Sequence, residues 1–383
     1  MRWNRIHNAL CLFGLFTIGC IEPYTLEGVK TDPQYLVVDG FIDASESTCA
    51  VRLSRAVSLN TEHVPPGEVG ASVSVKSEDG EEFFLAEVEA EDTGLYLADD
   101  VSVVSDKSYK LYIVLGNGSH YESDFIRIER AAEIESLIWE PEAEDVKIRI
   151  STVPNTSSTQ FYRWRFEETW QYNAPRASSF IIRDGMAQLR EPHERVYTCY
   201  RTEPSYNILI GSSQHLASNV VQNYVVQSIP TSSIKISAIY NIRVRQYALS
   251  EEAYTFWLNL YKTTESTGGL FDPMPGQVIG NIKGVTNPSE PVVGYFSGST
   301  VEEASVWIRR SDFAAGYVRY RTPFCAPDTL AVDQIAGLPE RTPLIDAIYG
   351  PFGSVVGYTF GSPSCVDCRI YGGGTTTKPE LWP

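Results

Sequence analysis

The sequence predicts a mainly β protein with two folded domains, and three observations lead to this class. Aromatic residues make up 12% of the 383 residues, and 28 glycines and 22 prolines accompany only 3 methionines. Aromatic and β-branched residues favour strands, while glycine and proline favour the turns between them. Short runs of alternating apolar and polar residues recur and end at turn signals, and one segment alone has helical spacing.

The first nineteen residues have the pattern of an export signal. Arg2 and Arg5 precede an apolar run over residues 9–18, which is too short to cross the roughly 30 Å core of a bilayer as a helix. Gly19 and Cys20 follow at once, and a small residue directly before a cysteine is typical of bacterial lipoprotein signals. We expect residues 1–19 to be removed and Cys20 to carry acyl chains, palmitate among them, that hold the protein at a membrane. An ordinary secretory signal is the alternative.

A polar tether over residues 20–33 precedes the first predicted domain, residues 34–129. About seven strands fit into this segment. Residues 71–76 alternate strictly and lead into Glu-Asp-Gly at 78–80, and Gly-Asn-Gly at 116–118 marks a second hairpin. This spacing of strands and turns predicts a small antiparallel sandwich of immunoglobulin-like or transthyretin-like type.

Residues 130–383 form the second, larger β-rich domain, interrupted by one amphipathic helix at about 250–264. Ser250 suits the N-cap, and Glu251 and Glu252 follow in the first turn, where the helix dipole favours acidic side chains. Apolar residues recur at a spacing of three and four, which predicts a face packed on the sheet. The residues of this face are Ala253, Phe256, Trp257, Leu260 and Tyr261.

Five cysteines remain once Cys11 leaves with the signal and Cys20 is acylated. They are Cys49, Cys199, Cys325, Cys365 and Cys368. An exported protein meets oxidising conditions, so we expect the last four to form disulfides that staple the C-terminal tail. We favour pairing of each cysteine of the Cys365-x-x-Cys368 motif with Cys199 or Cys325, and a direct Cys365–Cys368 bridge is the alternative. Cys49 is left without an assigned role.

The net charge limits the possible partners. The formal charge is −17 at neutral pH. Such a protein repels nucleic-acid phosphates, so no nucleic acid is expected as a partner. It repels anionic lipid headgroups for the same reason, and the lipid at Cys20 is therefore expected to supply the membrane attachment.

Motifs of known chemistry are absent from the sequence. It contains no Gly-x-Ser-x-Gly elbow, no His-x-x-x-His pair, no P-loop and no Gly-x-Gly-x-x-Gly. We therefore predict no catalytic residues, no metal and no cofactor. Glu167 and Glu168 are the best guess at a pair of carboxylates for glycoside hydrolysis, although a solvated strand edge is the favoured interpretation.

Several dispersed segments, taken together, resemble one protein family. They are residues 20–24, 35–40, 252–257, 271–282, 293–296 and 365–382. In order and composition they are similar to domain-of-unknown-function family 4249, found in outer-membrane lipoproteins of Bacteroidetes-type bacteria, over nearly the whole mature chain. The resemblance implies no assigned chemistry. It implies a frequent association with TonB-dependent receptors of the outer membrane.

These observations predict a lipid-anchored, non-enzymatic binding or accessory subunit at the outer membrane. Its expected partner is a TonB-dependent β-barrel or another outer-membrane complex, and Glu22, close behind the lipidated cysteine, favours the cell surface. Capture of glycans or peptides by exposed aromatic residues is the first alternative, with Trp170 and Tyr172 as candidate platforms. A hydrolase of unfamiliar type is the second alternative.

Overall fold

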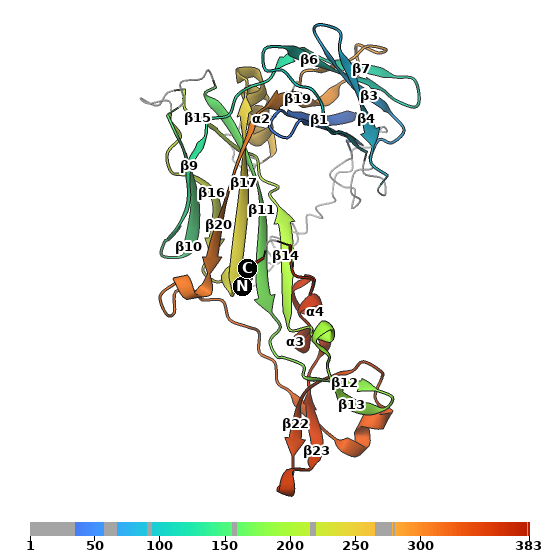
Figure 1. The fold of residues 1–383 in the computed structure, drawn as a ribbon, viewed down its shortest axis with the longest axis vertical. Coiled ribbons are helices and arrows are strands. Elements are labelled where there is room, and N and C mark those ends of the chain that lie inside the picture. Colours follow the sequence, from blue (N-terminus) through green and yellow to red (C-terminus); the bar gives the residue numbers. More distant parts are fainter. Residues whose placement is uncertain are drawn as a thin grey trace, which may run out of the picture.

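The computed structural model describes residues 35–56, 67–89, 94–154, 159–214, 220–264, 278, 280–380 and 382–383. Three units follow one another along the longest axis of the molecule (Figure 1). We call them the upper, central and distal units. All three are built mainly from strands, so the predicted fold class is confirmed. The expected signal, tether and lipidation site at Cys20 lie outside the described residues.

The upper unit is a two-layered arrangement of strands around one core. Its strand order is β18-β7-β6-β3-β4-β5-β2-β1-β19, and β4 pairs with both β3 and β5, so the two layers meet at this strand. Val51 and Leu53 from one layer and Leu111 and Ile113 from the other share a core. The strands from the first part of the chain are β1 (Leu36–Asp43), β2 (Thr48–Arg55), β3 (Ser72–Ser77), β4 (Glu82–Glu87), β5 (Leu95–Ala98), β6 (Ser108–Val114), β7 (His120–Ser123) and β8 (Ile126–Arg127).

Two strands from much later in the chain complete the upper unit. β19 (Val292–Ser299) runs parallel to β1, with Leu36 opposite Val292 and Asp43 opposite Ser299. β18 (Ile282–Gly284) pairs with β7. The sheet that begins within residues 34–129 therefore extends beyond the expected boundary at residue 129. Pairing of this kind covers the open hydrogen-bonding edges that β1 and β7 would otherwise present.

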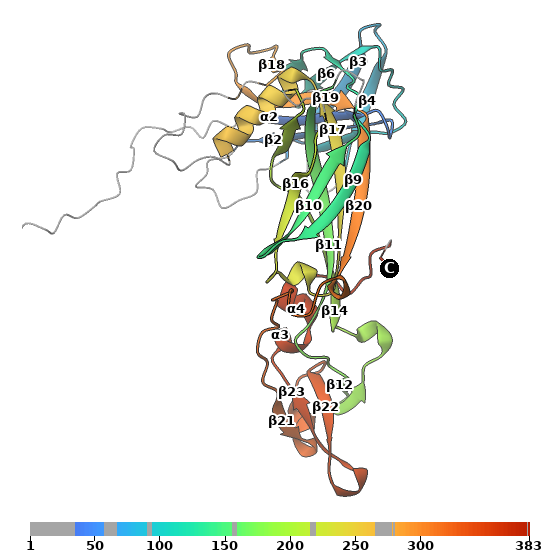
Figure 2. The same cartoon turned by 90° about the vertical axis from the view of Figure 1, so that its left-hand side faces the viewer.

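The central unit is built on two long antiparallel strands, β11 (Phe161–Asn173) and β17 (Ile239–Leu249). They lie in a sheet with β14, β15 and β20, while β9, β10 and β16 form a second sheet beside it (Figure 2). Ile148 of β10 and Trp164 of β11 are buried in the shared core. The remaining strands are β9 (Ile134–Pro141), β10 (Asp145–Thr152), β14 (Thr198–Pro204), β15 (Leu209–Ser212), β16 (Tyr224–Pro230) and β20 (Val301–Arg309).

The predicted helix is confirmed as α2 (Glu251–Thr264). The Ser250 hydroxyl accepts a hydrogen bond from the backbone N–H of Ala253 at 3.2 Å, so Ser250 caps the helix as expected. Phe256 and Trp257 are buried, and the Phe256 ring lies 5.2 Å from that of Tyr295 on β19. The helix thus packs where the upper and central units meet. Tyr261 is the exception on the predicted face, because its side chain is exposed.

The distal unit is a small sheet in the order β13-β12-β22-β23-β21. Ile182, Ile335, Leu344 and Tyr358 form its core. Its strands are β12 (Phe180–Arg183), β13 (Met186–Leu189), β21 (Asp328–Ala331), β22 (Pro343–Tyr349) and β23 (Val355–Phe360). Short helical turns complete the described chain, namely η1 (Pro192–Glu194), η2 (Ile234–Ile236), η3 (Arg310–Asp312), η4 (Val332–Gly337), η5 (Pro351–Gly353), α3 (Pro363–Val366) and α4 (Cys368–Gly372).

Two disulfides staple the C-terminal tail, and they have the favoured connectivity. Cys199 on β14 pairs with Cys368 on α4, with their Cα atoms 5.6 Å apart, and Cys325 pairs with Cys365, with their Cα atoms 5.8 Å apart. The alternative Cys365–Cys368 bridge is wrong. Cys49 is a free thiol in the core of the upper unit, and burial raises its pKa to about 12. A protonated, enclosed thiol is chemically inert, so Cys49 has a packing role.

Candidate functional site

The two aromatic residues proposed as binding platforms are buried. Trp170 is 3% exposed and Tyr172 is 1% exposed, so neither can stack with a ligand in this structure, and that interpretation is wrong. The Tyr172 hydroxyl donates to the carbonyl of Cys368 at 3.0 Å and accepts from the N–H of Gly374 at 2.8 Å. Because side chains alternate along β11, both rings point to the same face, which packs against the core and the C-terminal tail. The sequence does not show that the tail packs there.

Glu167 and Glu168 do not form a catalytic pair, because neighbouring residues of a strand point to opposite faces. The expectation of a solvated edge is also wrong for Glu168, which is 4% exposed on a strand paired on both sides. Its carboxylate is held by an ion pair with Lys235 and by a 2.8 Å hydrogen bond from the Tyr240 hydroxyl. Glu167 is on the exposed face, 3.3 Å from Arg243. Glu168 is therefore a satisfied structural carboxylate.

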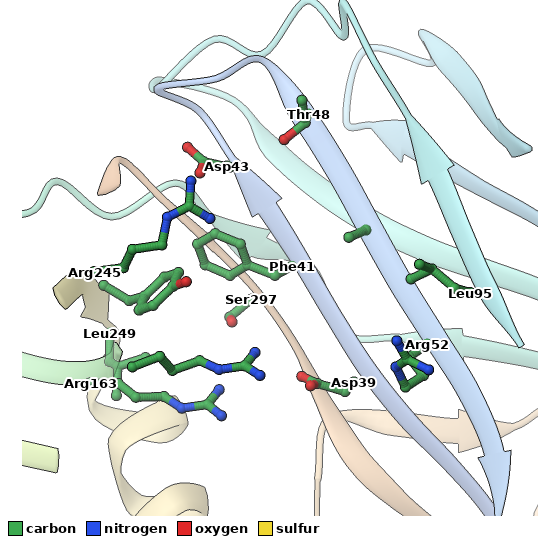
Figure 3. A pocket seen from close by; sticks show the side chains of 13 residues that line it. Asp39, Phe41, Asp43, Thr48, Arg52, Leu95, Arg163, Arg245, Leu249 and Ser297 are labelled. Carbon is green, nitrogen blue, oxygen red and sulfur yellow. The ribbon is translucent and has the colours of Figure 1, made fainter. Parts of the chain in front are cut away.

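The most chemically distinctive feature is a cleft between the upper and central units, with a volume of about 280 Å³. Strands β1 and β2 of the upper unit form one wall, and strands β11 and β17 of the central unit form the other (Figure 3). The charged residues that line it are Asp39, Asp43, Arg52, Arg163, Arg165 and Arg245. Arginines outnumber aspartates four to two there, so the cleft is positive although the chain as a whole is strongly acidic.

The register of the central sheet places the arginines together. Arg165 of β11 lies directly opposite Arg245 of β17, and Arg163 is two residues earlier on the same face. Like charges in directly opposed positions destabilise an antiparallel pair. Arg245 offsets its charge through a 3.2 Å hydrogen bond to Glu303 of β20. Within the part of the chain that the structure describes, Arg163 and Arg165 have no carboxylate within ion-pair distance.

Arg163 is held in place by packing rather than by an ion pair. Its guanidinium lies over the ring of Trp257 from α2, 3.4 Å from the ring centroid. Burial lowers the pKa of Arg163 to about 10, while the nearby charge of Asp39 opposes that effect. The guanidinium is therefore still cationic at neutral pH, and it is partly desolvated. A cation in this condition gains more from an incoming anion than an exposed one does.

The upper wall of the cleft carries the two aspartates. Figure 3 shows Arg163 extending toward Asp39 and Arg245 extending toward Asp43. Asp43 already accepts backbone hydrogen bonds from Ser45 at 2.9 Å and Glu46 at 3.1 Å, which hold the turn after β1. Phe41 and Tyr247 meet edge to face across the junction, with ring centroids 5.0 Å apart. The cleft thus combines guanidinium donors with an apolar floor.

This lining is suited to recognition by charge and shape. The described residues around the cleft include hydroxyls, carboxylates and guanidinium groups, but no histidine or cysteine. No group of three or more potential metal ligands occurs among the described residues either. Sequence reasoning missed the cleft. The available signal was the alternate-residue spacing of Arg163 with Arg165 and of Arg243 with Arg245, which places each pair on one face of a strand.

A second feature is the distal hairpin, which we define as β22, β23 and their turn. It is the lower extremity of the molecule in Figure 1. Tyr349, Phe352, Val355 and Val356 are exposed on it, and Phe352 is completely exposed. The turn holds Phe352 at φ 73°, a left-handed conformation that bulky residues rarely adopt. Residues 347–366 contain no charged side chain.

Together these features define a class, an elongated mainly β protein with an arginine-lined cleft, an exposed apolar hairpin and a disulfide-stapled tail. Comparison with protein families then places the chain. Residues 21–305 match the model described as Domain of unknown function (DUF4249), and the chain belongs to this family. The match includes every residue of the cleft, whereas the tail segment 365–382, included in the resemblance above, lies beyond it. A search of curated proteins found no match. In the described part of the chain, no helix is both long and apolar enough to span a bilayer.

Proposed function

We propose that this protein is a lipid-anchored, non-enzymatic accessory subunit of an outer-membrane complex, which contacts a protein partner through its distal hairpin. The observation that carries the proposal is the exposed apolar tip around Phe352. The partner expected from the sequence is a TonB-dependent β-barrel, and Cys20 is the expected lipid attachment.

The composition of the distal unit supports a role in binding a protein. Of the eighteen large apolar residues that are exposed in the described chain, seven lie on this small sheet and its turns. They are Met186, Leu189, Val332, Tyr349, Phe352, Val355 and Val356. Apolar side chains gathered in this way typically mark interaction surfaces in soluble folds. The absence of charge over residues 347–366 removes the repulsion that this acidic protein would otherwise exert on an acidic partner.

The conformation of the turn supports the same role. Phe352 lies between Gly350-Pro351 and Gly353, and the N–H of Gly350 donates to the carbonyl of Ser354 at 2.8 Å. Glycine would adopt the observed φ without strain, so phenylalanine costs stability here. Strain of this kind is typical of residues retained for contact with another molecule. An aromatic side chain at the centre of a small interface is a frequent source of binding energy.

The test is co-purification from the native membrane. The full-length protein with its own signal is isolated in mild detergent, and stoichiometric partners are identified by mass spectrometry. The proposal expects a β-barrel to co-purify with the unaltered protein. Phe352→Gly should lower its recovery at least tenfold, because the substitution removes the ring while suiting the backbone.

A matched control is available on the upper unit. Phe84 of β4 is also a highly exposed aromatic residue, and Phe84→Ser should leave partner recovery unchanged. Equal recovery with Phe352→Gly would reject the hairpin as the contact. Isolation of the unaltered protein without any partner would reject the accessory role itself.

Binding of a small ligand is the second candidate function, and the arginine-lined cleft favours it. This role does not depend on the distal hairpin, because the two features lie in different units of the molecule.

A further inference from the structure

We infer that the cleft between the upper and central units binds a small organic anion, whose carboxylate or phosphate group is held by Arg163, Arg165 and Arg245. This inference is independent of the proposed partner docking. It rests on the placement of the three guanidinium groups, on the size of the cleft and on its aromatic floor.

Without a ligand, the arrangement of the three arginines is electrostatically unfavourable. The sheet register places Arg165 opposite Arg245, and Arg163 adds a third positive charge on the same face. Among the described residues, Glu303 is the only carboxylate that hydrogen-bonds to any of the three, and it binds Arg245. An anion between Arg163 and Arg165 would relieve the repulsion and give the partly desolvated guanidinium of Arg163 a hydrogen-bond acceptor. Guanidinium groups match the paired oxygens of a carboxylate or phosphate in geometry as well as charge.

The guanidinium groups are held in place before any anion binds. Stacking on Trp257 fixes the guanidinium of Arg163, so little side-chain freedom remains to be lost when an anion binds. Arg165 and Arg245 are carried by the two longest strands among the described residues, which are paired along eleven residues. Donors held on rigid strands give a more precise site than donors on a loop. The site therefore has the features expected of a preformed anion receptor.

The volume and lining of the cleft limit the size and charge of the ligand. A volume of about 280 Å³ lies near the lower end of the range of ligand pockets, about 300–1,000 Å³, which suits a monosaccharide or a dipeptide. Phe41 and Tyr247 provide an aromatic surface for the uncharged part of such a molecule. Asp39 and Asp43 line the opposite wall and disfavour molecules with several negative charges. The inferred ligand therefore carries a net charge of about −1 on a compact body, as an acidic sugar or a short acidic peptide does.

The test is titration calorimetry on the full-length lipoprotein in mild detergent. The probes are D-glucuronate, the dipeptide Ala-Glu, inorganic phosphate and, as a neutral reference, D-glucose. We expect at least one acidic probe to bind tenfold or more tightly than glucose, with an affinity that falls as salt is raised. Tighter binding of glucuronate or Ala-Glu identifies a carboxylate ligand, and tighter binding of phosphate identifies a phosphorylated one.

Variants separate the cleft from general charge effects. Arg165→Gln should weaken binding of the acidic probe at least tenfold. Arg319→Gln removes the same charge from an exposed arginine that pairs with Glu144 at a turn of the central unit, and it should bind as the unaltered protein does. Because Arg165→Gln relieves repulsion, a melting temperature at or above that of the unaltered protein shows that any loss of binding is not caused by unfolding.

Two results would overturn the inference. One is that no acidic probe binds more tightly than glucose to the unaltered protein. The other is that Arg165→Gln and Arg319→Gln bind the acidic probe equally well. Neither result bears on the distal hairpin, because partner recovery is measured separately with Phe352→Gly.

Discussion

The hydroxyl of Tyr240 donates a 2.8 Å hydrogen bond to the carboxylate of Glu168 inside the central unit. Both residues are buried, on the neighbouring strands β17 and β11. Lys235 completes the neutralisation of this carboxylate, and the Gln227 amide adds contacts at 3.3 Å. A buried charge without such partners would cost several kcal/mol, so the cluster stabilises the fold only as a complete set.

Replacement of Tyr240 by phenylalanine should destabilise the protein. The change removes a hydrogen bond to a charged acceptor and leaves the ring in place, so we expect a loss of about 1.5–3 kcal/mol in the free energy of unfolding. Chemical denaturation at pH 7 measures it. Tyr200→Phe, at a tyrosine outside this cluster, is the control and should cost less. An equal loss in both variants would contradict a special role for the Glu168 cluster.

The same tyrosine should make stability depend on pH in the alkaline range. Burial first, and then the charge of Glu168, raise the pKa of Tyr240 well above its ordinary value. The folded protein keeps this proton when the unfolded chain has lost it. The stabilisation is therefore complete below about pH 10 and falls by about 1.4 kcal/mol per pH unit above it. Denaturation midpoints between pH 9 and 11 should fall less steeply for Tyr240→Phe than for the unaltered protein.

Reduction of the disulfides should destabilise the tail and the distal unit. The Cys199–Cys368 and Cys325–Cys365 bridges join residues 169 and 40 positions apart. Because each bridge restricts the unfolded chain, the two bridges should raise the free energy of unfolding by about 5 and about 4 kcal/mol, respectively. We expect a lower melting temperature in reducing agent and faster amide exchange over β21 to β23. Cys49→Ala should retain the full sensitivity to reducing agent, since its thiol is not bridged. A melting temperature unaffected by reduction would rule out this role for the bridges.

Removal of the charge at Arg165 should stabilise the ligand-free protein. Arg165 lies opposite Arg245 in the sheet, and like-charge pairs in this position are unfavourable. Arg165→Gln should therefore raise the free energy of unfolding by about 0.2–1 kcal/mol. The effect should shrink at high salt, where the repulsion is screened. A destabilised variant would indicate that Arg165 has a structural partner in solution.

Substitution of Cys20 tests the anchor. Cys20→Ala should abolish incorporation of radiolabelled palmitate and release the protein from the membrane fraction. The folded body should keep its melting temperature, because Cys20 precedes the described strands. Continued labelling of Cys20→Ala would exclude this residue as the acylation site.

Much of the local structure could be predicted from the sequence. The helix 250–264 appears as Glu251–Thr264, because its capping serine and its apolar spacing are local features. The alternating run 71–76 became β3 for the same reason. The expectation that Cys365 and Cys368 each pair with Cys199 or Cys325 is confirmed, but the sequence does not choose which cysteine pairs with which. The pairing of residues 292–299 with the first sheet was not predicted, because alternation along a strand does not indicate which other strand it pairs with.

For the candidate sites too, the sequence predicted local features but not the contacts between distant segments. Trp170 and Tyr172 belong to a strand that the sequence predicts. The alternation of residues along this strand does not show which of its faces the C-terminal tail covers. Arg163 and Asp39 are 124 positions apart in the sequence and line one cleft. Secondary structure depends on neighbours within a few residues, so the sequence by itself determined the mainly β class and the helix. The export signal before Cys20 stays a prediction. Burial and charge clustering depend on contacts between distant segments, so only the tertiary structure decided that a strongly acidic chain contains an arginine-lined cleft.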